Sequence, residues 1–175
     1  MVNFSQLDRR RRRRFLHLFG AALILPGSAI AADRRGSGLP MPRFVSLRAA
    51  EVNMRTGPGV RYPVAWVYRR SGLPVEVIAE FDTWRKVRDW QGSQGWIHQS
   101  MLSGRRTFIA VGGPHLLHRE ADEQAPPVAQ IEDGVVGKIL SYSAAALWCR
   151  VETQGYRGWI PRTAVWGVYP TEDID

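Results

Sequence analysis

The sequence is poor in the residues that most directly build chemical sites. Its 175 residues contain one cysteine and four histidines. A single cysteine excludes an intramolecular disulfide framework and any zinc site made of cysteine clusters. The chain also has no apolar run of the roughly 18 residues that a membrane-spanning helix needs, and no Gly-x-Ser-x-Gly elbow, phosphate-binding loop or dinucleotide-binding glycine motif. We therefore expect no cofactor and no metal.

Acidic residues are few beside the basic ones, but the excess is local. The chain has 24 Lys and Arg against 16 Asp and Glu, a formal net charge of +8, and six of the arginines form one run at 9–14. Residues 32–175 alone carry 18 cations and 15 acids, a net charge of +3. A surface so balanced gives little reason to expect nucleic-acid binding. With 45% apolar residues, the chain can build a packed core, which excludes wholesale disorder.

An apolar segment, a Pro-Gly pair and several small residues follow the arginine run. This three-part layout is typical of a secretory signal peptide. We expect cleavage after Ala31, with Ala29 and Ala31 in the small pockets of signal peptidase. The alternatives are a nucleic-acid-binding arm, which leaves the apolar segment unexplained, and an uncleaved membrane anchor. The predicted location is the periplasm or another exported compartment.

Part of the arginine run resembles the twin-arginine export motif, which directs folded proteins across the bacterial inner membrane. Arg12 and Arg13 supply the arginine pair, and Phe15 and Leu16 follow at the expected positions. Arg11 stands where a Ser or Thr normally precedes the pair. The sequence thus leaves both the twin-arginine and the general secretory route open.

The rest of the chain contains an internal tandem repeat. Residues 84–87 (Trp-Arg-Lys-Val) recur 64 positions later as 148–151 (Trp-Cys-Arg-Val), and 95–97 (Gly-Trp-Ile) recur 63 positions later as 158–160. Such self-similarity indicates two structural repeats.

Domain boundaries follow from this repeat. Upstream, an offset of 64 pairs Arg55 with Arg119. We divide the chain into a signal peptide (1–31), a linker (32–43), a first domain (44–104), a second domain (105–170) and a tail (171–175). The first domain carries eight cations and five acids, whereas residues 105–175 carry seven cations and nine acids, so opposite charge is expected to help the copies dock.

Both copies have the pattern of short strands. Apolar side chains alternate with their neighbours along 64–68 and 75–81, as in half-buried strands, and 92–95 has the composition of a hairpin tip. Outside 1–31 no segment shows a convincing helical stripe. About five short strands in about 60 residues predict a small barrel, because closure leaves the fewest open edges.

Both copies resemble the bacterial SH3-like (SH3b) domains. In the first copy the resemblance rests on residues 52–59 (Val-Asn-Met-Arg-Thr-Gly-Pro-Gly), 62–64 (Tyr-Pro-Val), 84–87, 95–97 and a terminal helical turn at 100–102. The second copy keeps the tryptophans but has Glu-Ala-Asp-Glu at 120–123 in place of the glycine-rich loop. The resemblance implies an all-β fold of two tandem SH3-like barrels.

The resemblance also implies binding without catalysis, since bacterial SH3-like domains commonly target peptidoglycan or envelope peptides. Two barrels leave too few residues for a catalytic domain. We expect the first copy to recognise peptidoglycan or an envelope peptide, with the second copy as a structural partner. The alternative is a protein-interaction module for an envelope protein, without cell-wall binding.

Candidate ligand-binding residues come from the first copy. Tyr62, with Trp66 or Trp84 nearby, is predicted to line a shallow groove for an extended peptide, and Arg55 belongs to the same loop. The competing interpretation is that these aromatic rings fill or close a small barrel. Trp90 has no counterpart in the second copy, and we expect it to be exposed and to make a contact that is specific to the first copy.

The remaining polar candidates have simpler interpretations. The cations Arg69, Arg70, Arg85, Lys86 and Arg88 could meet carboxylates of stem peptides or of an acidic partner, but a solvated face is the favoured interpretation.

Two further side-chain types invite chemistry. His115 and His118 are spaced as metal ligands could be, but no carboxylate or cysteine at ligand spacing supports them beyond Glu120. Cys149 could serve as a nucleophile only beside a basic group, and no residue marks one, so a buried structural thiol is expected.

Overall fold

Short antiparallel strands and two single 3₁₀ turns make up the part of the chain that the computed structural model describes, residues 36–145 and 147–175. The predicted signal peptide, its export motif and its cleavage site lie outside these residues. Within the described ranges no helix is long and apolar enough to span a membrane. Both repeats belong to the same compact unit.

The first repeat forms a seven-stranded sheet in the order β3-β2-β6-β5-β4-β1-β7. Its strands are β1 (Arg43–Leu47), β2 (Val52–Arg55), β3 (Val64–Tyr68), β4 (Pro74–Phe81), β5 (Trp84–Arg88), β6 (Gln94–His98) and β7 (Leu102–Ser103), with the turn η1 (Gln99–Met101) between the last two.

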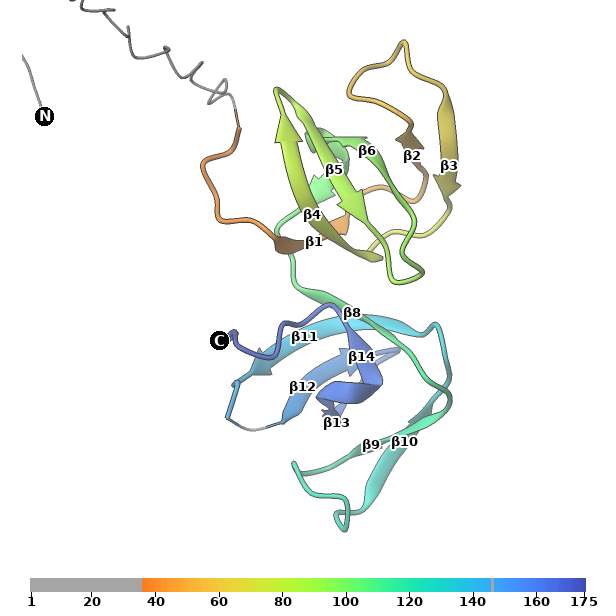
Figure 1. Cartoon of the computed structure of the whole chain (residues 1–175). Helices are drawn as coiled ribbons and strands as arrows, with labels where there is room; N and C mark the ends of the chain where they lie inside the picture. Colours follow the sequence, from red (N-terminus) through yellow and green to blue (C-terminus); the bar gives the residue numbers. More distant parts are fainter. Residues whose placement is uncertain (1–35, 146) are drawn as a thin grey trace, which may run out of the picture. The chain divides into compact units, whose positions relative to one another are not determined.

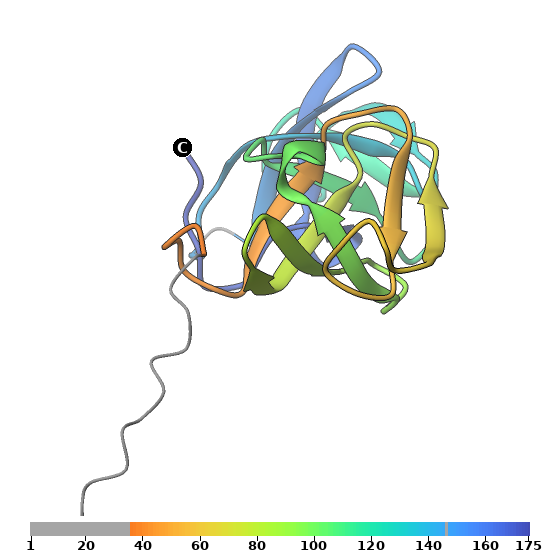
Figure 2. The same ribbon diagram turned by 90° about the horizontal axis from the view of Figure 1, so that it is seen from above.

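The second repeat forms a sheet in the order β10-β9-β13-β12-β11-β8-β14. Its strands are β8 (Thr107–Ala110), β9 (His115–His118), β10 (Pro127–Ile131), β11 (Val136–Tyr142), β12 (Trp148–Thr153), β13 (Tyr156–Pro161) and β14 (Val165–Trp166), with the turn η2 (Arg162–Ala164) before β14. Each strand has the place of the strand seven earlier in the chain. Figure 1 shows the two barrels one after the other along the chain, and Figure 2 shows them from above. The prediction of two tandem SH3-like barrels is therefore confirmed.

Each barrel closes over its own apolar core. The first core includes Leu47, Val52, Met54, Tyr68, Val75, Val77, Val87 and Ile97. The second includes Phe108, Leu117, Ile131, Ile139, Cys149, Val151 and Ile160. On β5 the buried Val87 and the half-buried Trp84 have opposite parity, as the sequence predicted, so the two side chains point to opposite faces.

The two cores are filled differently at one equivalent position. In the first barrel Val45 pairs with Val75 across β1 and β4. In the second barrel Phe108 pairs with Gly137 across β8 and β11. A Cβ atom on Gly137 would lie 2.5 Å from the Phe108 ring and 2.5 Å from the carbonyl oxygen of Glu152, so the ring and the neighbouring backbone both require a residue without a side chain here.

Register corrects one detail of the repeat. Arg55 is paired with Trp96, and the residue paired with the equivalent Trp159 is His118. The structural partner of Arg55 is thus His118, at an offset of 63, and the earlier match to Arg119 is wrong. The sequence misled because the loops that follow share little composition.

Apolar side chains join the two barrels. Ile109 lies on β8 of the second barrel, is 2% exposed, and belongs to the core cluster of the first barrel. Val136 and Trp166 pack against the same cluster. The ring of Phe44 contacts Trp166 edge-on, with 4.8 Å between centroids, and lies 4.6 Å from the ring of Tyr169. These contacts explain why the first half of β4, expected to be half-buried, is buried on both faces.

Hydrogen bonds, and not ion pairs, add to this interface. The Tyr169 hydroxyl donates to Glu76 at 2.8 Å, and Arg70 donates to the carbonyl of Gly134 at 3.0 Å. Every ion pair among the described residues lies within one repeat or its flanking segment. No ion pair among the described residues therefore supports the expected docking through opposite charge; apolar contacts join the copies, together with one hydrogen bond to the Glu76 carboxylate and one to a backbone carbonyl.

The segments expected as linker and tail are attached to the barrels. Glu80 accepts hydrogen bonds from Ser37 and Arg43 at the start of the first barrel. At the other end Ile174 and Tyr142 exchange backbone hydrogen bonds of 2.7 and 2.8 Å. Residues of both segments thus extend the two barrels.

Candidate functional site

The loop between β2 and β3 is held in shape by Arg55. Its guanidinium donates to the carbonyls of Val60 at 3.1 Å and Tyr62 at 2.8 Å. The backbone closes the loop with a hydrogen bond from Thr56 to Pro63. Arg55 therefore positions the loop, and its charge is already engaged with the loop carbonyls.

Tyr62 lies over the glycine-rich part of the same loop. A Cβ atom on Gly57 would lie 2.5 Å from the tyrosine ring, so this close approach requires glycine. The exposed Arg61 places its guanidinium 5.1 Å from the ring centroid and donates to the Tyr62 hydroxyl at 3.3 Å. The loop thus presents an aromatic ring beside an accessible cation.

Three exposed apolar side chains adjoin this loop. Val60 is 78% exposed, Val64 42% and Trp66 55%. Val64 and Trp66 are two residues apart on β3 and lie on either side of a β-bulge, with Val64 paired with Arg55 and Trp66 with Met54. We call these three residues the hairpin patch. Several exposed apolar side chains on one hairpin are a common mark of an interaction surface.

A row of aromatic and basic side chains borders the loop on the outer face of the first barrel. Trp96 on β6 is paired with Arg55 on one side and Lys86 on the other. In the adjacent row Trp84 contacts His98 edge-on, with 5.4 Å between ring centroids. All five side chains lie on one face because directly paired residues, and residues two apart, share a face.

The structure brings most of the predicted ligand residues together. Arg55, Tyr62 and Trp66 belong to one hairpin, and Trp84 lies on the neighbouring outer face. Trp90 is not part of this group. It is half-buried and packs against the core of the first barrel, so the expectation of an exposed contact is wrong.

The reason for this position of Trp90 is the turn that contains it. The buried Asp89 accepts hydrogen bonds from the backbone amides of Gln91 at 3.0 Å and Ser93 at 2.8 Å, and from the Tyr68 hydroxyl at 2.9 Å. Burial, followed by the Asp89 charge and hydrogen bond, raises the pKa of Tyr68. The turn is thereby anchored to the barrel, and Trp90 follows it inward.

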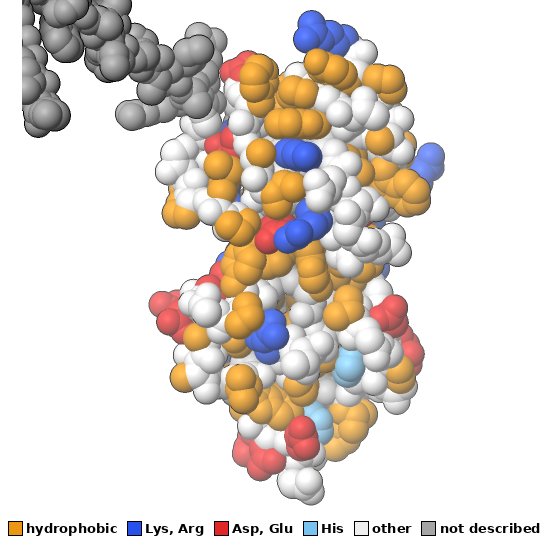
Figure 3. Space-filling view, in the orientation of Figure 1, with side chains coloured by type: hydrophobic (Ala, Val, Ile, Leu, Met, Phe, Trp, Pro, Cys, Tyr) orange, Lys and Arg blue, Asp and Glu red, His pale blue; other side chains and the backbone are white. Residues whose placement is uncertain are grey.

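The cations of β5 are mostly engaged within the first barrel. Arg85 is 5% exposed and contacts Glu80 at 3.1 Å. Arg88 pairs with the buried Glu76 at 2.5 Å. The interpretation of these residues as a solvated face is thus wrong for Arg85, which has an inward position on its strand. Figure 3 shows hydrophobic side chains interspersed with Lys and Arg over the first barrel, whereas most acidic side chains visible on this face lie over the second.

The second barrel keeps the framework of this surface but not its exposed apolar groups. His118 replaces Arg55 and contacts the loop carbonyl of Ala125 at 2.8 Å, as Arg55 contacts that of Tyr62. Trp148 packs edge-on against His118 at 5.7 Å. At the positions of the hairpin patch the second copy has Glu123, Pro127 and Ala129.

The remaining candidates have structural roles. His115 contacts the carbonyl of Val111 at 2.8 Å. Among the residues the structure describes, no three His, Cys, Asp or Glu side chains gather as a metal site. Cys149 is fully buried, as expected, and burial raises the pKa of its thiol to about 12. His115, His118 and Cys149 are thus not presented to a ligand.

Sequence reasoning missed Val60, Val64 and Trp96 as members of the surface. The sequence contained a signal for Trp96, because it directly follows Gly95 in the closing strand. In a barrel of this strand order, that position pairs with residues of both neighbouring strands. Val60 and Val64 had none, since single valines in a loop or at a strand end do not indicate their exposure.

The fold and this surface define a class: small SH3-like β-barrels in tandem, in which a loop and an outer sheet face carry the exposed aromatic residues. The model of the bacterial SH3 domain family matches residues 48–104 and 113–167, which is more than half of the chain. The chain belongs to the bacterial SH3 domain family and contains two copies of that domain.

Other comparisons add little. No curated protein matches the chain. Two solved structures from Trichomonas vaginalis are similar: NlpC2, with 14% identity over 73% of this chain and 49% of that one, and NlpC1, with 15% identity over 75% and 48%. Both have a TM-score of 0.33. The chain spans about half the length of these two structures, and a likeness this low has no bearing on function.

Proposed function

We propose that the protein is an exported, non-enzymatic binding protein that recognises peptidoglycan or envelope peptides through its first SH3-like domain. One observation supports this choice above all others. The hairpin patch exposes a tryptophan and two valines in the first copy, and the equivalent positions in the second copy hold glutamate, proline and alanine. A difference that leaves the framework intact and alters only exposed groups is best explained by binding.

The chemistry of the loop suits a peptide that carries carboxylates. Trp66 and Val64 are exposed apolar side chains of one hairpin that an extended chain can contact. Arg61 is exposed beside Tyr62 and can pair with an acidic group of the ligand. Arg55 supports binding indirectly by fixing the loop carbonyls.

Retention on purified sacculi tests the proposal. The protein is expected to be retained at low salt, and Trp66→Ala should lower its apparent affinity by about tenfold or more, as loss of a central aromatic contact does. Tyr156→Ala is the matched control, because Tyr156 is 53% exposed on the second barrel and should leave retention unchanged.

Two results would overturn the proposal. Absence of retention of the unaltered protein would exclude cell-wall recognition and would favour a module for an envelope protein partner. Equal losses for both variants would place the interaction outside the hairpin patch.

The exported location rests on the residue pattern of 1–31 and needs a separate test. Fractionation of a Gram-negative host should place the protein in the periplasm, and its mass there should correspond to a chain beginning at Ala32. A full-length protein retained in the cytoplasm would contradict the proposed export.

A further inference from the structure

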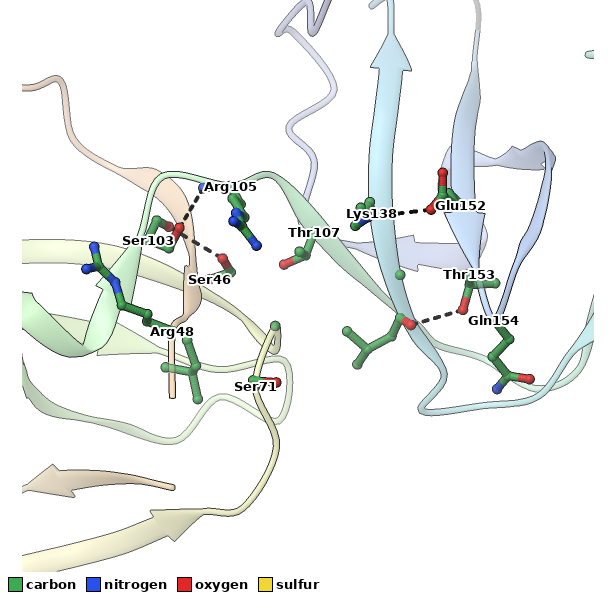
Figure 4. A pocket seen from close by; sticks show the side chains of 14 residues that line it. Ser46, Arg48, Ser71, Ser103, Arg105, Thr107, Lys138, Glu152, Thr153 and Gln154 are labelled. Atoms are coloured by element: carbon green, nitrogen blue, oxygen red, sulfur yellow. Dashed lines mark hydrogen bonds and ion pairs between the residues drawn. The ribbon is translucent and has the colours of Figure 1, made fainter. Parts of the chain in front are cut away.

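A cleft of about 670 Å³ lies between the two barrels. Figure 4 shows Ser46, Ser103 and Arg105 on the side of the first barrel and Lys138 and Glu152 on the side of the second. The volume falls within the range of about 300–1,000 Å³ that is usual for small-ligand sites. The cleft contains no residue of the hairpin patch, so it is a separate site.

Positive charge predominates in the cleft. Arg48, Arg105 and Lys138 line it, against one acid, Glu152. Glu152 already contacts Lys138 at 3.4 Å and Arg157, which lies outside the cleft, at 2.7 Å. The Arg105 side chain makes no hydrogen bond to any residue that the structure describes. The cleft therefore has cationic groups available for an anion.

The wall also holds an unpartnered buried hydroxyl. Thr107 is 7% exposed and lines the cleft, and its Oγ1 atom has no hydrogen-bond partner among residues 36–145 and 147–175. Folding normally pairs such a group because an unpaired buried hydroxyl is costly. Ser46 makes only a long contact of 3.5 Å with the carbonyl of Ser103. The hydroxyl groups of Thr107 and Ser46 can therefore still form hydrogen bonds with a ligand in the same cleft that the cations line.

We propose that the cleft binds a short peptide through one of its carboxylates. Arg105 and Lys138 would pair with the carboxylate, and the hydroxyls and Gln154 would meet backbone amides of the peptide. No aromatic side chain lines the cleft, so the stacking by which sugar rings and bases are commonly held is not offered. Ser103 lies on β7, which ends the first sheet and pairs with β1, an edge suited to an extended peptide.

This site extends the proposed function without depending on it. The probe is the tripeptide Ala-Glu-Ala with free termini, titrated calorimetrically into the full-length protein at low salt. Its analogue Ala-Gln-Ala with an amidated C-terminus removes both carboxylates, and inorganic phosphate supplies a simple anion. We expect the acidic tripeptide to bind at least tenfold more tightly than either. Equal binding of phosphate would reduce the cleft to a general anion attractor and overturn the proposal.

Three variants identify the site. Arg105→Gln should weaken tripeptide binding about tenfold, whereas Arg69→Gln, the same change at an exposed residue outside the cleft, should not. Thr107→Val should weaken binding about threefold without lowering the midpoint of urea unfolding, because the hydroxyl it removes has no partner within the protein. If Thr107→Val leaves binding unchanged, or if Arg69→Gln matches Arg105→Gln, the site is not this cleft. Trp66→Ala should leave tripeptide binding intact, which separates failure here from failure of the hairpin patch.

Discussion

Ile109 gives the sharpest test of how the two barrels depend on each other. It lies on β8 of the second barrel, yet its side chain is 2% exposed and belongs to the core cluster of the first. Ile109→Ala removes every side-chain carbon beyond Cβ from this shared contact. The neighbours Val136 and Trp166 are held by their own strands, so they cannot collapse fully into the space.

The cost can be worked from this burial. Transfer of the removed groups to water accounts for about 2.4 kcal/mol at ~0.8 kcal/mol for each carbon. The cavity that remains adds to this, and buried Ile→Ala changes lie at about 2–5 kcal/mol. We therefore expect the free energy of unfolding to fall by about 3 kcal/mol. Urea unfolding should remain a single transition, because both barrels lose the same contact.

The assay is urea denaturation followed in parallel by tryptophan fluorescence and far-ultraviolet circular dichroism. Leu116→Ala is the control, since Leu116 is 46% exposed on the second barrel and its loss should cost less than about 0.5 kcal/mol. The reasoning is refuted if Ile109→Ala costs less than about 1 kcal/mol, or if the unaltered protein unfolds in two separate transitions. Either result would mean that the barrels are independently stable.

Two substitutions and one labelling experiment probe the remaining polar groups. Tyr68→Phe leaves one oxygen of the buried Asp89 without its donor and should cost about 2 kcal/mol, measured by urea unfolding; a loss below about 0.5 kcal/mol would show that the bond contributes little. Burial by itself would raise the pKa of Glu80, but the hydrogen bonds from Arg43 and Ser37 outweigh it and hold the pKa at about 2, below the ordinary 4.5. Because the folded-state pKa is lowered, the stabilisation is complete above about pH 4.5 and is lost as the pH falls toward 2. The difference in unfolding free energy between the protein and Glu80→Gln should shrink across that window, and a difference that does not vary with pH would contradict this. Cys149, with its pKa raised to about 12 by burial, should resist iodoacetamide at pH 8 in the native protein and react fully in urea; equal labelling rates would show that the thiol is accessible.

Much of the fold followed from the sequence because tryptophans mark equivalent strands. The recurrence of 84–87 at 148–151 located β5 and β12, and alternation along 64–68 and 75–81 located β3 and β4. These features depend on local side-chain periodicity, which a strand imposes directly.

Contacts between the repeats could not be predicted in this way. β8 has four consecutive buried residues, Thr107–Ala110, because one face packs in the second barrel and the other against the first. Alternation identifies a strand with one solvent face, and a strand buried on both faces gives no such pattern. The contact surface between the two barrels therefore could not be predicted from the sequence pattern.

The candidate site was predicted in part for a similar reason. Tyr62, Trp66 and Arg55 are close in sequence, so one hairpin brings them together. The placement of Trp90 depends on hydrogen bonds from Asp89 to its own turn and to Tyr68, a residue 21 positions earlier. A long-range contact of this kind leaves no periodic trace.

The exchange of Val45 and Val75 for Phe108 and Gly137 has a consequence for how the two copies can diverge. A valine at Gly137 alone would collide with the ring that fills this space, and a valine at Phe108 alone would leave a void. Substitution of both together relieves the collision with the ring, but the new Cβ atom would still lie 2.5 Å from the carbonyl oxygen of Glu152. Both the ring of Phe108 and the backbone of β12 therefore require glycine at position 137, so recombination between the two halves of the gene is expected to be selected against whenever it brings the valine of the first repeat to this position.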